Sequence, residues 1–535
     1  MQNGHENGTS NAPNPRVVDE PASLRSKWPV AKDLAGSSKP CRLEGEIGDV
    51  VVLGSVPAEL DGVFYRVMCD PYVPPHPGNV PIDGDGNISA FRFKDGRVDF
   101  KMRYVETERY VLERRANKAL FGLYRNPFSH HPCVRAAVDS TANTNVVFWA
   151  NKLLALKEVA NPYEVHPRTL ETLGYDPFGD QIQSRTFTAH PKVDQATSEL
   201  VTFGYEAKGL ATLDVATYTL NKDGIKVEEL WLKAPWCAFA HDCAITKNWL
   251  VLMLMPFEAN IERMKKGGQH WAWRYEKPVT FIVVPRRKHP VRADWKDGET
   301  RYYYWKNCMP IHTGGAWEDE NGVIFLESTR VHDNAFGFFP SEDGRVPAKD
   351  TKADFVRWRI DPSQPTNTSI PDPLVVLDVP SEFPRIDERF MGREYKYLWL
   401  NVFMPMKSDG GNNIFEGLNG IAQHNHKTGK TEWYYCGDDS LVQEPIFVPR
   451  SADALEGDGW VMALVERVKE NRSEVVILDT KQFTKPVAIV QLPFHVKAQI
   501  HGNWVDGKSL AMLDPFVRDP PPVQLSNKSA MNFLP

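Results

Sequence analysis

From Gly45 onward the chain alternates short runs of apolar and aromatic residues with polar turns. The runs are separated by Asp-Gly, Glu-Gly, Asn-Gly or Thr-Gly pairs, which favour tight connections between β-strands. Examples of such strand-like segments lie at residues 88–107, 229–235, 322–328 and 473–483. The run Trp249–Met255 is apolar throughout, which is typical of a strand that is buried on both faces. We therefore expect an all-β protein built from many short strands.

Helical patterns are scarce, and the clearest predicts a helix over residues 258–268 that ends at a Gly-Gly pair. Residues 1–35 are rich in Asn, Pro, Ser and charge, which predicts a disordered or loosely packed arm. No linker interrupts residues 45–510, so we interpret residues 36–535 as a single domain. Many short strands over such a length favour a β-propeller over a sandwich or a small barrel. The sequence contains no clean internal repeat from which the number of blades could be counted.

The composition of the chain argues against several classes of function. The chain of 535 residues has a net charge of −6 and no Lys/Arg run, which argues against a nucleic-acid partner. Its seven cysteines are scattered without a CxxC pair, as expected for free thiols in a reducing compartment. The first ten residues lack the apolar core of a secretory signal, and the longest apolar run is too short for a membrane span. We therefore expect a cytoplasmic protein with no transmembrane segment.

Four of the fifteen histidines stand at the edge of an apolar stretch, beside a small residue or a turn. They are His190 in RTFTAHPKVD, His241 in CAFAHDCAIT, His312 in CMPIHTGGAWE and His501 in AQIHGNWVD. Their separations of 51, 71 and 189 residues exclude a local zinc finger or an HExxH helix. Ligands gathered from different blades would fit these separations. Spacing alone also allows four unrelated histidines that are exposed or held by hydrogen bonds.

Several segments, in order along the chain, resemble those of the carotenoid cleavage oxygenase family. TAHPKVD, AHDCAIT, IHTGGAWE and IHGNWV are similar to its four iron-ligand signatures. Further matches are VPAELDGVFYRV (56–67), IDGDGNISAFRFKDG (82–96), LLALKE (153–158), EFPRIDERFMGREYKY (382–397) and EPIFVPR (444–450). The resemblance implies a seven-bladed β-propeller with a cap of loops and short helices over an axial iron site. The implied cofactor is Fe(2+), and its implied ligands are His190, His241, His312 and His501.

A metal-bound imidazole is neutral and presents one particular nitrogen, so its other N–H needs an acceptor. The family supplies glutamates for this purpose, and they map onto Glu158, Glu382 and Glu444. The resemblance pairs these in chain order with His241, His312 and His501. It leaves His190 without a glutamate. The alternative interpretation is that the three glutamates lie on the surface, although Glu158 and Glu444 directly adjoin apolar runs.

Two other positions bear on the implied metal site. Thr144, in TANTNVV, matches a family position whose methyl group partly blocks one open coordination position and so shapes the oxygen site. Gly315 precedes Ala316-Trp317-Glu318, where the family commonly has Asn. We therefore expect the packing behind His312 to differ from that of other members.

Lys157 precedes the glutamate of LLALKE, where carotenoid-cleaving members tend to carry an apolar or aromatic residue. A buried ammonium is costly in a hydrocarbon tunnel unless it is paired, but it suits a phenol or phenolate. The segment LFGLYRNPF (120–128) resembles the stilbene-cleaving branch, in which a tyrosine and this lysine hold the 4′-hydroxyl of the substrate. The matching positions are Tyr124 and Lys157. The alternative is a Lys157 that points outward and a Tyr124 that only fills the core.

Within the family, the chain resembles the fungal resveratrol-cleaving members. This implies an oxygenase that uses O2 to cleave the central C=C bond of hydroxystilbenes such as resveratrol and piceatannol, giving two aromatic aldehydes. A carotenoid or apocarotenoid oxygenase with the same metal site is the nearest alternative. A metal-free propeller that acts as an interaction scaffold is an alternative from another class. The set of four histidines and three glutamates argues against the scaffold.

Overall fold

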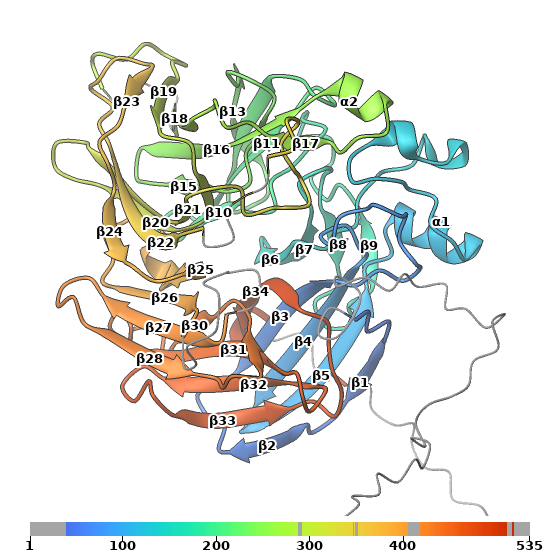
Figure 1. Ribbon diagram of the computed structural model, residues 1–535. Helices are drawn as coiled ribbons and strands as arrows, with labels where there is room; N and C mark the ends of the chain where they lie inside the picture. The colour runs from blue at the N-terminus through green and yellow to red at the C-terminus, as the bar shows by residue number, and fades with distance from the viewer. Residues whose placement is uncertain are drawn as a thin grey trace, which may run out of the picture.

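The computed structural model describes residues 39–286, 292–345, 347, 351–404, 418–510 and 516–517. Residues 1–35, for which we predicted an N-terminal arm, lie outside the described residues. The described strands form seven sheets, which are arranged around a common centre as in a β-propeller (Figure 1). The protein is therefore an all-β propeller.

The first four sheets are built mainly from strands that precede β20 (Met309–Glu318), and the last described strand of the chain, β34 (Gln499–Asp506), joins the first of them. The first contains β1 (Gly45–Ile47), β5 (Arg97–Tyr104), β4 (Gly86–Lys94), β3 (Gly62–Cys69) and β34 (Gln499–Asp506). The second contains β6 (Asn145–Trp149), β7 (Lys152–Leu156), β8 (Tyr163–Val165) and β9 (Thr172–Tyr175). The third contains β10 (Lys192–Asp194), β11 (Glu199–Tyr205), β12 (Asp214–Leu220) and β13 (Lys226–Lys233). The fourth contains β14 (Ala238–Phe239), β15 (Cys243–Ile245), β16 (Trp249–Ala259), β17 (Trp271–Trp273), β18 (Val279–Pro285), β19 (Arg301–Trp305) and β23 (Thr368–Ser369).

Three further sheets follow. The fifth contains β20 (Met309–Glu318), β21 (Ile324–Val331), β22 (Ala353–Ile360) and β24 (Leu374–Leu377). The sixth contains β25 (Ser381–Ile386), β26 (Tyr397–Val402), β27 (Gly420–Asn425) and β28 (Thr431–Tyr435). The seventh contains β2 (Val51–Gly54), β33 (Pro486–Gln491), β32 (Arg472–Asp479), β31 (Gly459–Arg467), β30 (Ile446–Pro449) and β29 (Ser440–Val442).

The apolar run that begins at Trp249 forms β16, and both faces of this strand are buried. Leu250, Leu252 and Leu254 pack into one hydrophobic cluster. Trp249, Val251 and Met253 point to the other face and pack into a second cluster, together with residues of the fifth sheet. Because successive side chains of a strand alternate between its two faces, a strand between two neighbouring sheets needs apolar residues at every position.

Strands from the two ends of the chain share sheets and close the ring. Early strand β3 pairs with β34, and early strand β2 pairs with β33. Figure 1 shows the blue strand β3 beside the red strand β34. Closure of this kind leaves fewer unpaired sheet edges than an open arrangement would.

The innermost strands of neighbouring sheets contact one another and so bring distant segments together. β10 contacts β15, β15 contacts β20, and β20 contacts β25. β25 and β34 both contact β30, and β34 also contacts β6. Residues at the ends of these strands therefore meet near the centre of the ring.

Helices are few and short, and they differ from the helix predicted over residues 258–268. There, β16 extends through Ala259, and α2 covers only Ile261–Lys265. The Asn260 side chain accepts a hydrogen bond from Arg263 N and so begins the helix. Helix α1 (Glu108–Ala116), which was not predicted, begins in the same way at Thr107. The remaining helical turns are η3 (Pro127–Ser129), η4 (Pro132–Val134), η5 (Glu388–Phe390) and η6 (Gly507–Leu510).

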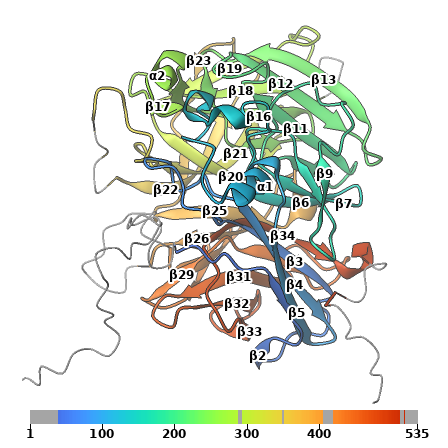
Figure 2. The same cartoon turned by 90° about the vertical axis from the view of Figure 1, so that its right-hand side faces the viewer.

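Helices α1 and α2 lie on the same side of the sheets, as the two views show (Figures 1 and 2). Among the described residues, none of the helices combines the length and hydropathy that a bilayer crossing requires.

Candidate metal centre and phenol site

Four buried histidines converge from four different sheets. His190 precedes β10, His241 lies between β14 and β15, and His312 and His501 lie on β20 and β34. One ring nitrogen of each histidine lies within 4.8 Å of the corresponding atoms of the other three. Nε2 of His241 is 3.0 Å from Nε2 of His312. The fold thus gathers four imidazoles that are far apart in the sequence.

Buried glutamates lie within hydrogen-bond distance of Nδ1 of His241 and of His312. Nδ1 of His241 lies 2.6 Å from Oε1 of Glu158, two residues after the end of strand β7. Nδ1 of His312 lies 2.6 Å from Oε2 of Glu382, on β25. The other oxygen of Glu382 accepts a hydrogen bond from Thr329 Oγ1 at 2.7 Å. Each carboxylate can therefore accept the Nδ1–H of its histidine and set the orientation of the ring.

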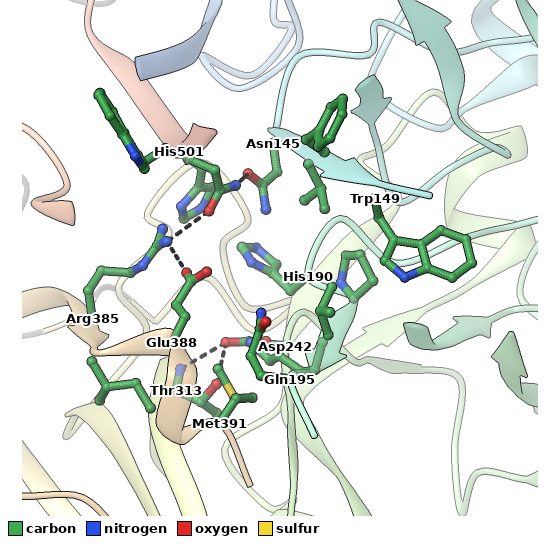
Figure 3. A pocket seen from close by; sticks show the side chains of 18 of the residues that line it. Asn145, Trp149, His190, Gln195, Asp242, Thr313, Arg385, Glu388, Met391 and His501 are labelled. Carbon is green, nitrogen blue, oxygen red and sulfur yellow. Dashed lines mark hydrogen bonds and ion pairs between the residues drawn. The ribbon is translucent and has the colours of Figure 1, made fainter. Parts of the chain in front are cut away.

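The third glutamate belongs to a longer polar chain. Nδ1 of His501 lies 3.0 Å from Oε1 of Glu444. Oε2 of Glu444 accepts a hydrogen bond from the backbone N–H of Gly502 at 3.1 Å and lies 3.2 Å from Nη1 of Arg385. Arg385 in turn pairs with Glu388, as Figure 3 shows. These three histidine–glutamate pairs are the pairs that the family resemblance implies.

The inward-facing nitrogens fit a metal cation. A neutral imidazole has one N–H and one lone pair, so an Nδ1–H that is donated to a glutamate leaves the lone pair on Nε2. Nε2 of His190 and Nε2 of His501 are buried and have no hydrogen-bond partner among the described residues. Nε2 of His241 and Nε2 of His312 face each other, and both would be acceptors. A cation that binds these lone pairs removes the cost of leaving them buried without a partner.

Burial and nearby charges shift the pKa values of three of the histidines. Burial and the neighbouring imidazoles hold the pKa of His190 and of His501 well below the usual value of 6.5, although Asp242 opposes this at His190. Burial also acts to lower the pKa of His312, but the carboxylates of Glu382, Asp242 and Glu444 together raise the pKa of this histidine. A proton on His312 therefore competes with a metal ion more than a proton on His190 or His501 does.

Asp242 joins three of the histidine-bearing segments, and our reading of the sequence did not identify it. This buried residue follows His241, and its Oδ2 accepts hydrogen bonds from the backbone N–H and the hydroxyl of Thr313 at 2.8 and 2.9 Å (Figure 3). Its Oδ1 lies 2.8 Å from Nζ of Lys192, two positions after His190. Burial acts to raise the pKa of Asp242, but Lys192 together with His190 and His312 holds this pKa below the usual range. The only sequence signal was its place beside a histidine.

A polar cavity of about 490 Å³ reaches the cluster (Figure 3). Its lining includes His190, His312 and His501. Many of the other lining side chains are polar or charged, among them Asn145, Lys192, Gln195, Asp242, Arg385 and Glu388. Neither Tyr124 nor Lys157 lines this cavity. The phenol site predicted from the sequence therefore lies elsewhere around the metal centre.

Lys157 and Tyr124 are buried next to each other. Nζ of Lys157 lies 5.1 Å from the centre of the Tyr124 ring. The ammonium donates hydrogen bonds to Asn143 Oδ1 at 3.0 Å and to the carbonyl oxygen of Ile82 at 3.2 Å. The hydroxyl of Tyr124 is buried without a hydrogen-bond partner among the described residues. Lys157 thus does not point outward, which excludes the alternative interpretation of that residue.

Burial perturbs both groups. It lowers the pKa of Lys157 from its usual 10.5, although the carboxylates of Asp83 and Glu158 oppose the change. Burial and the charge of Glu158 raise the pKa of Tyr124 well above 10.0, although the nearby guanidinium of Arg125 opposes the change. The hydroxyl therefore keeps its proton, and because a guanidinium can only donate, this proton still lacks an acceptor among the described residues. A buried ammonium and a buried hydroxyl donor without an acceptor form a site that suits an oxygen atom with partial or full negative charge.

The structure also shows the surroundings of Thr144 and Gly315. The hydroxyl of Thr144 donates to Asn143 Oδ1 at 3.0 Å, the same atom that accepts from Lys157. At Gly315, an added Cβ would come within 2.7 Å of the Tyr395 ring. The Tyr395 ring therefore occupies the space behind β20 that a larger residue at position 315 would need.

Aromatic side chains form a continuous row of contacts from Tyr124 to His241. Phe339 packs against Tyr124, with ring centres 5.8 Å apart, and against Phe257 at 6.1 Å. Phe257 packs against Phe239 at 5.9 Å, and Phe239 packs against His241 at 5.7 Å. Such surroundings exclude water and suit a flat aromatic molecule.

Comparison with known proteins agrees with this geometry. The sequence model of the retinal pigment epithelial membrane protein family matches residues 38–506. A Botryotinia fuckeliana protein named resveratrol cleavage oxygenase 1 is 67% identical over 97% of this chain and 93% of that protein. An Aspergillus fumigatus protein of the same name is 41% identical over 91% of this chain and 98% of that protein. The crystal structure of Pseudomonas brassicacearum lignostilbene dioxygenase has a TM-score of 0.84 and 38% identity, over 90% of this chain and 100% of that chain.

A β-propeller that gathers four buried histidines, three of them on glutamates, defines a class of non-haem, metal-dependent oxygenases. This chain belongs to the family of the retinal pigment epithelial membrane protein and the carotenoid cleavage oxygenases.

Proposed function

We propose that this protein is an Fe(2+)-dependent dioxygenase that uses O2 to cleave the central C=C bond of hydroxystilbenes such as resveratrol and piceatannol. The products are two aromatic aldehydes. Resveratrol cleavage is part of the name of two relatives that align over nearly their whole length. The observation that carries the proposal is the buried pair of Lys157 and Tyr124. Lys157 directly precedes Glu158, the glutamate that holds His241.

The proposed ligands of the iron are His190, His241, His312 and His501. Glu158, Glu382 and Glu444 act on three of these ligands by accepting their Nδ1–H. Four neutral imidazoles bring no negative charge to the metal and leave coordination positions open. Fe(2+), when bound there, supplies the one-electron chemistry that activates O2. Thr144 shapes the oxygen site through its methyl group.

Lys157 and Tyr124 act on the phenol. The ammonium of Lys157 and the hydroxyl of Tyr124 donate hydrogen bonds to the 4′-oxygen of the substrate. The positive charge of Lys157 lowers the pKa of the phenol and favours its ionised form. Electron density from the ionised oxygen reaches the central alkene through the aromatic ring and makes this bond more reactive toward O2. The aromatic side chains between Tyr124 and His241 hold the rings in place and exclude water.

The proposal also covers the number of blades, the cap over the metal centre and the domain organisation. Each of the seven sheets is one blade of a seven-bladed propeller, and loops and short helices, α1 and α2 among them, cap the face over the metal centre. Residues 36–535 form a single domain. The protein acts on a small molecule in the cytoplasm and has no nucleic-acid partner, as the composition predicts.

The two alternatives fit the site less well. A carotenoid or apocarotenoid offers no oxygen atom at the reacting segment of its chain for the ammonium of Lys157 and the unpaired hydroxyl of Tyr124. Binding of a hydrocarbon there would leave the Tyr124 hydroxyl and the third N–H of Lys157 without an acceptor, which is costly. An interaction scaffold gives no reason for four buried imidazoles with inward lone pairs.

Incubation of the iron-loaded protein with resveratrol and with its 4′-O-methyl ether tests the proposal. We expect two aromatic aldehydes from resveratrol and at least about 100-fold slower cleavage of the ether, because the site rejects a substrate that leaves its polar groups unpaired. Equal rates on both compounds, or cleavage of an apocarotenoid but of neither stilbene, would contradict it.

A further inference from the structure

Asn143 lies at the junction between the phenol site and Thr144. Its Oδ1 accepts one hydrogen bond from Nζ of Lys157 and one from the hydroxyl of Thr144, each at 3.0 Å. Its Nδ2 donates to the carbonyl oxygens of Ile82 and Gly84 at 3.0 and 2.7 Å. The Asn143 side chain is fully buried, at 0% exposure. All four hydrogen bonds that a side-chain amide can make are therefore made.

The partners of Asn143 allow only one orientation of its amide. An ammonium can only donate, and a backbone carbonyl oxygen can only accept. Oδ1 must therefore face Lys157, and Nδ2 must face Ile82 and Gly84. Because Ile82 O also accepts from Lys157, the amide, the ammonium and this carbonyl bond one another in a closed triangle. Two of the three N–H groups of Lys157 are used in this way.

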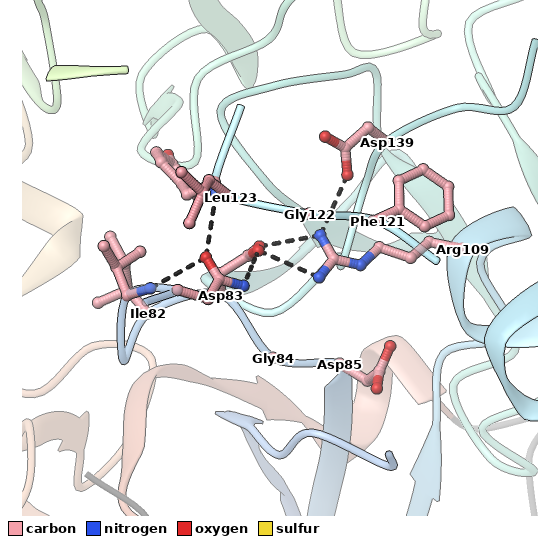
Figure 4. Close-up of polar contacts among 12 residues, drawn as sticks. Ile82, Asp83, Gly84, Asp85, Arg109, Phe121, Gly122, Leu123 and Asp139 are labelled. Atoms are coloured by element: carbon pink, nitrogen blue, oxygen red, sulfur yellow. Dashed lines mark hydrogen bonds and ion pairs between the residues drawn. The ribbon is translucent and has the colours of Figure 1, made fainter. Parts of the chain in front are cut away.

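Buried charged side chains hold the loop that carries the Ile82 carbonyl group. Asp83 follows Ile82, and both of its oxygens accept hydrogen bonds from Arg109 at 3.1 Å. Arg109, on helix α1, also bonds Asp139 at 3.1 Å (Figure 4). Asn79 donates to Asp83 at 2.8 Å and accepts from the backbone N–H of Tyr124 at 3.0 Å. The loop from Asn79 to Gly84 therefore contacts both proposed phenol-binding residues.

We propose that Asn143 is the positioning residue that sets the ammonium of Lys157 for the phenol and couples it to Thr144 at the oxygen site. The inference rests on the proposed function and deepens it. Asn143 and Ile82 O occupy two N–H groups of Lys157 and leave one for the substrate. The ammonium can therefore donate a hydrogen bond to the 4′-oxygen in only one direction. The hydroxyl of Thr144 binds the same amide oxygen, which sets its rotamer and hence the position of its methyl group.

Substrate discrimination of Asn143→Ala is the readout, because general damage to the fold would not change it selectively. We expect the ratio of kcat/KM for resveratrol to that for its 4′-O-methyl ether to fall about 10-fold or more, with most of the loss in KM for resveratrol. Asn87→Ala is the matched control: Asn87 is also fully buried, and its amide donates to Leu43 O at 3.0 Å and to Asp70. This control should keep the wild-type ratio.

A double-mutant cycle tests whether Asn143 acts through Lys157. In a Lys157→Met background, Asn143→Ala should change the resveratrol-to-ether ratio by less than about 2-fold, because the residue that it positions is gone. The cycle requires that each variant still cleaves both stilbenes at a measurable rate. The metal content of each variant shows whether it is folded. Equal effects of Asn143→Ala in both backgrounds, or a wild-type ratio in the single variant, would overturn the inference. Failure of the wild-type protein to discriminate the two stilbenes would instead overturn the proposed function itself.

Discussion

Nζ of Lys157 lies 5.1 Å from the centre of the Tyr124 ring, within a part of the protein where neither residue is exposed to water. Glu158, the next residue, holds Nδ1 of His241 at 2.6 Å. The lysine that is proposed to read the substrate and the glutamate that orients a proposed metal ligand are thus covalent neighbours. Because one backbone segment carries both groups, their effects can be separated only by changing one side chain at a time.

Replacement of Lys157 by Met should lower kcat/KM for resveratrol by at least about 100-fold, because a charged hydrogen bond to the substrate is lost. The metal content should not change, since Lys157 is not a ligand. Lys152→Met is a suitable control: Lys152 is the first residue of β7, the strand that ends just before Lys157, and it pairs with Glu164 at 2.7 Å. Full activity of Lys157→Met would show that this residue does not read the phenol.

Replacement of Tyr124 by Phe should separate stability from substrate binding. The hydroxyl of Tyr124 has no partner among the described residues, so its removal should leave the free energy of unfolding unchanged within about 0.5 kcal/mol, or raise it. KM for resveratrol should rise about 10-fold. In the control Tyr65→Phe, loss of the hydrogen bond to Pro167 O, 2.7 Å long, should cost about 1 kcal/mol and leave KM unchanged. Thermal unfolding and steady-state kinetics measure the two effects, and a loss of stability in Tyr124→Phe with an unchanged KM would contradict the prediction.

Replacement of His312 by Ala should abolish stoichiometric iron binding, because the remaining ligand nitrogens no longer complete the set of four. The wild-type protein should hold about one iron per chain when it is isolated with iron present. Elemental analysis of both proteins measures this. A wild-type protein that carries stoichiometric zinc and cleaves its substrate without iron would rule out the proposed cofactor.

The change Glu382→Gln tests the hydrogen bond behind His312. The amide can still accept from Nδ1–H but lacks the negative charge, so we expect a 10–100-fold loss of iron affinity or activity with the fold retained. Glu466→Gln is a matched control, since Glu466 is a buried glutamate 3.1 Å from Nδ1 of His495, outside the four-histidine cluster. If both variants matched the wild type in iron titration and turnover, Glu382 would have only a structural role.

Asp85 predicts a specific dependence of stability on pH. Burial, with Glu113 nearby, raises the pKa of this carboxyl from 3.8 to about 7, and its Oδ1 has no hydrogen-bond partner among the described residues. Because the folded-state pKa lies above the unfolded one, the folded protein binds the extra proton, and this contribution to stability falls as pH rises from about 4 to about 7. Asp85→Asn should therefore gain stability relative to the wild type at about pH 8 and show little gain at about pH 4. Parallel melting temperatures across this range would contradict the assignment.

Local patterns predicted much of the fold, and their failures have physical causes. The hairpin of β4 and β5 follows from Asp95-Gly96, whose φ angles of 51° and 76° are those of a tight turn. The helix over residues 258–268 was too long because β16 continues through Ala259, where pairing with β17 outweighs local helix preference. Helix α1 was missed because its sequence, ERYVLERRA, has few apolar positions from which a helical period could be read.

The sequence by itself determined the predominance of β-strands, the family resemblance, and the types of residue that the site contains. It placed His190, His241, His312 and His501 in four separate motifs, because each motif depends on neighbours along the chain. Only the tertiary structure brought their nitrogens within 4.8 Å, because that distance depends on how sheets from the whole chain close into one ring. Asn143 and Asp242 emerged only there, since a buried amide or carboxylate acquires its role from partners that distant strands supply.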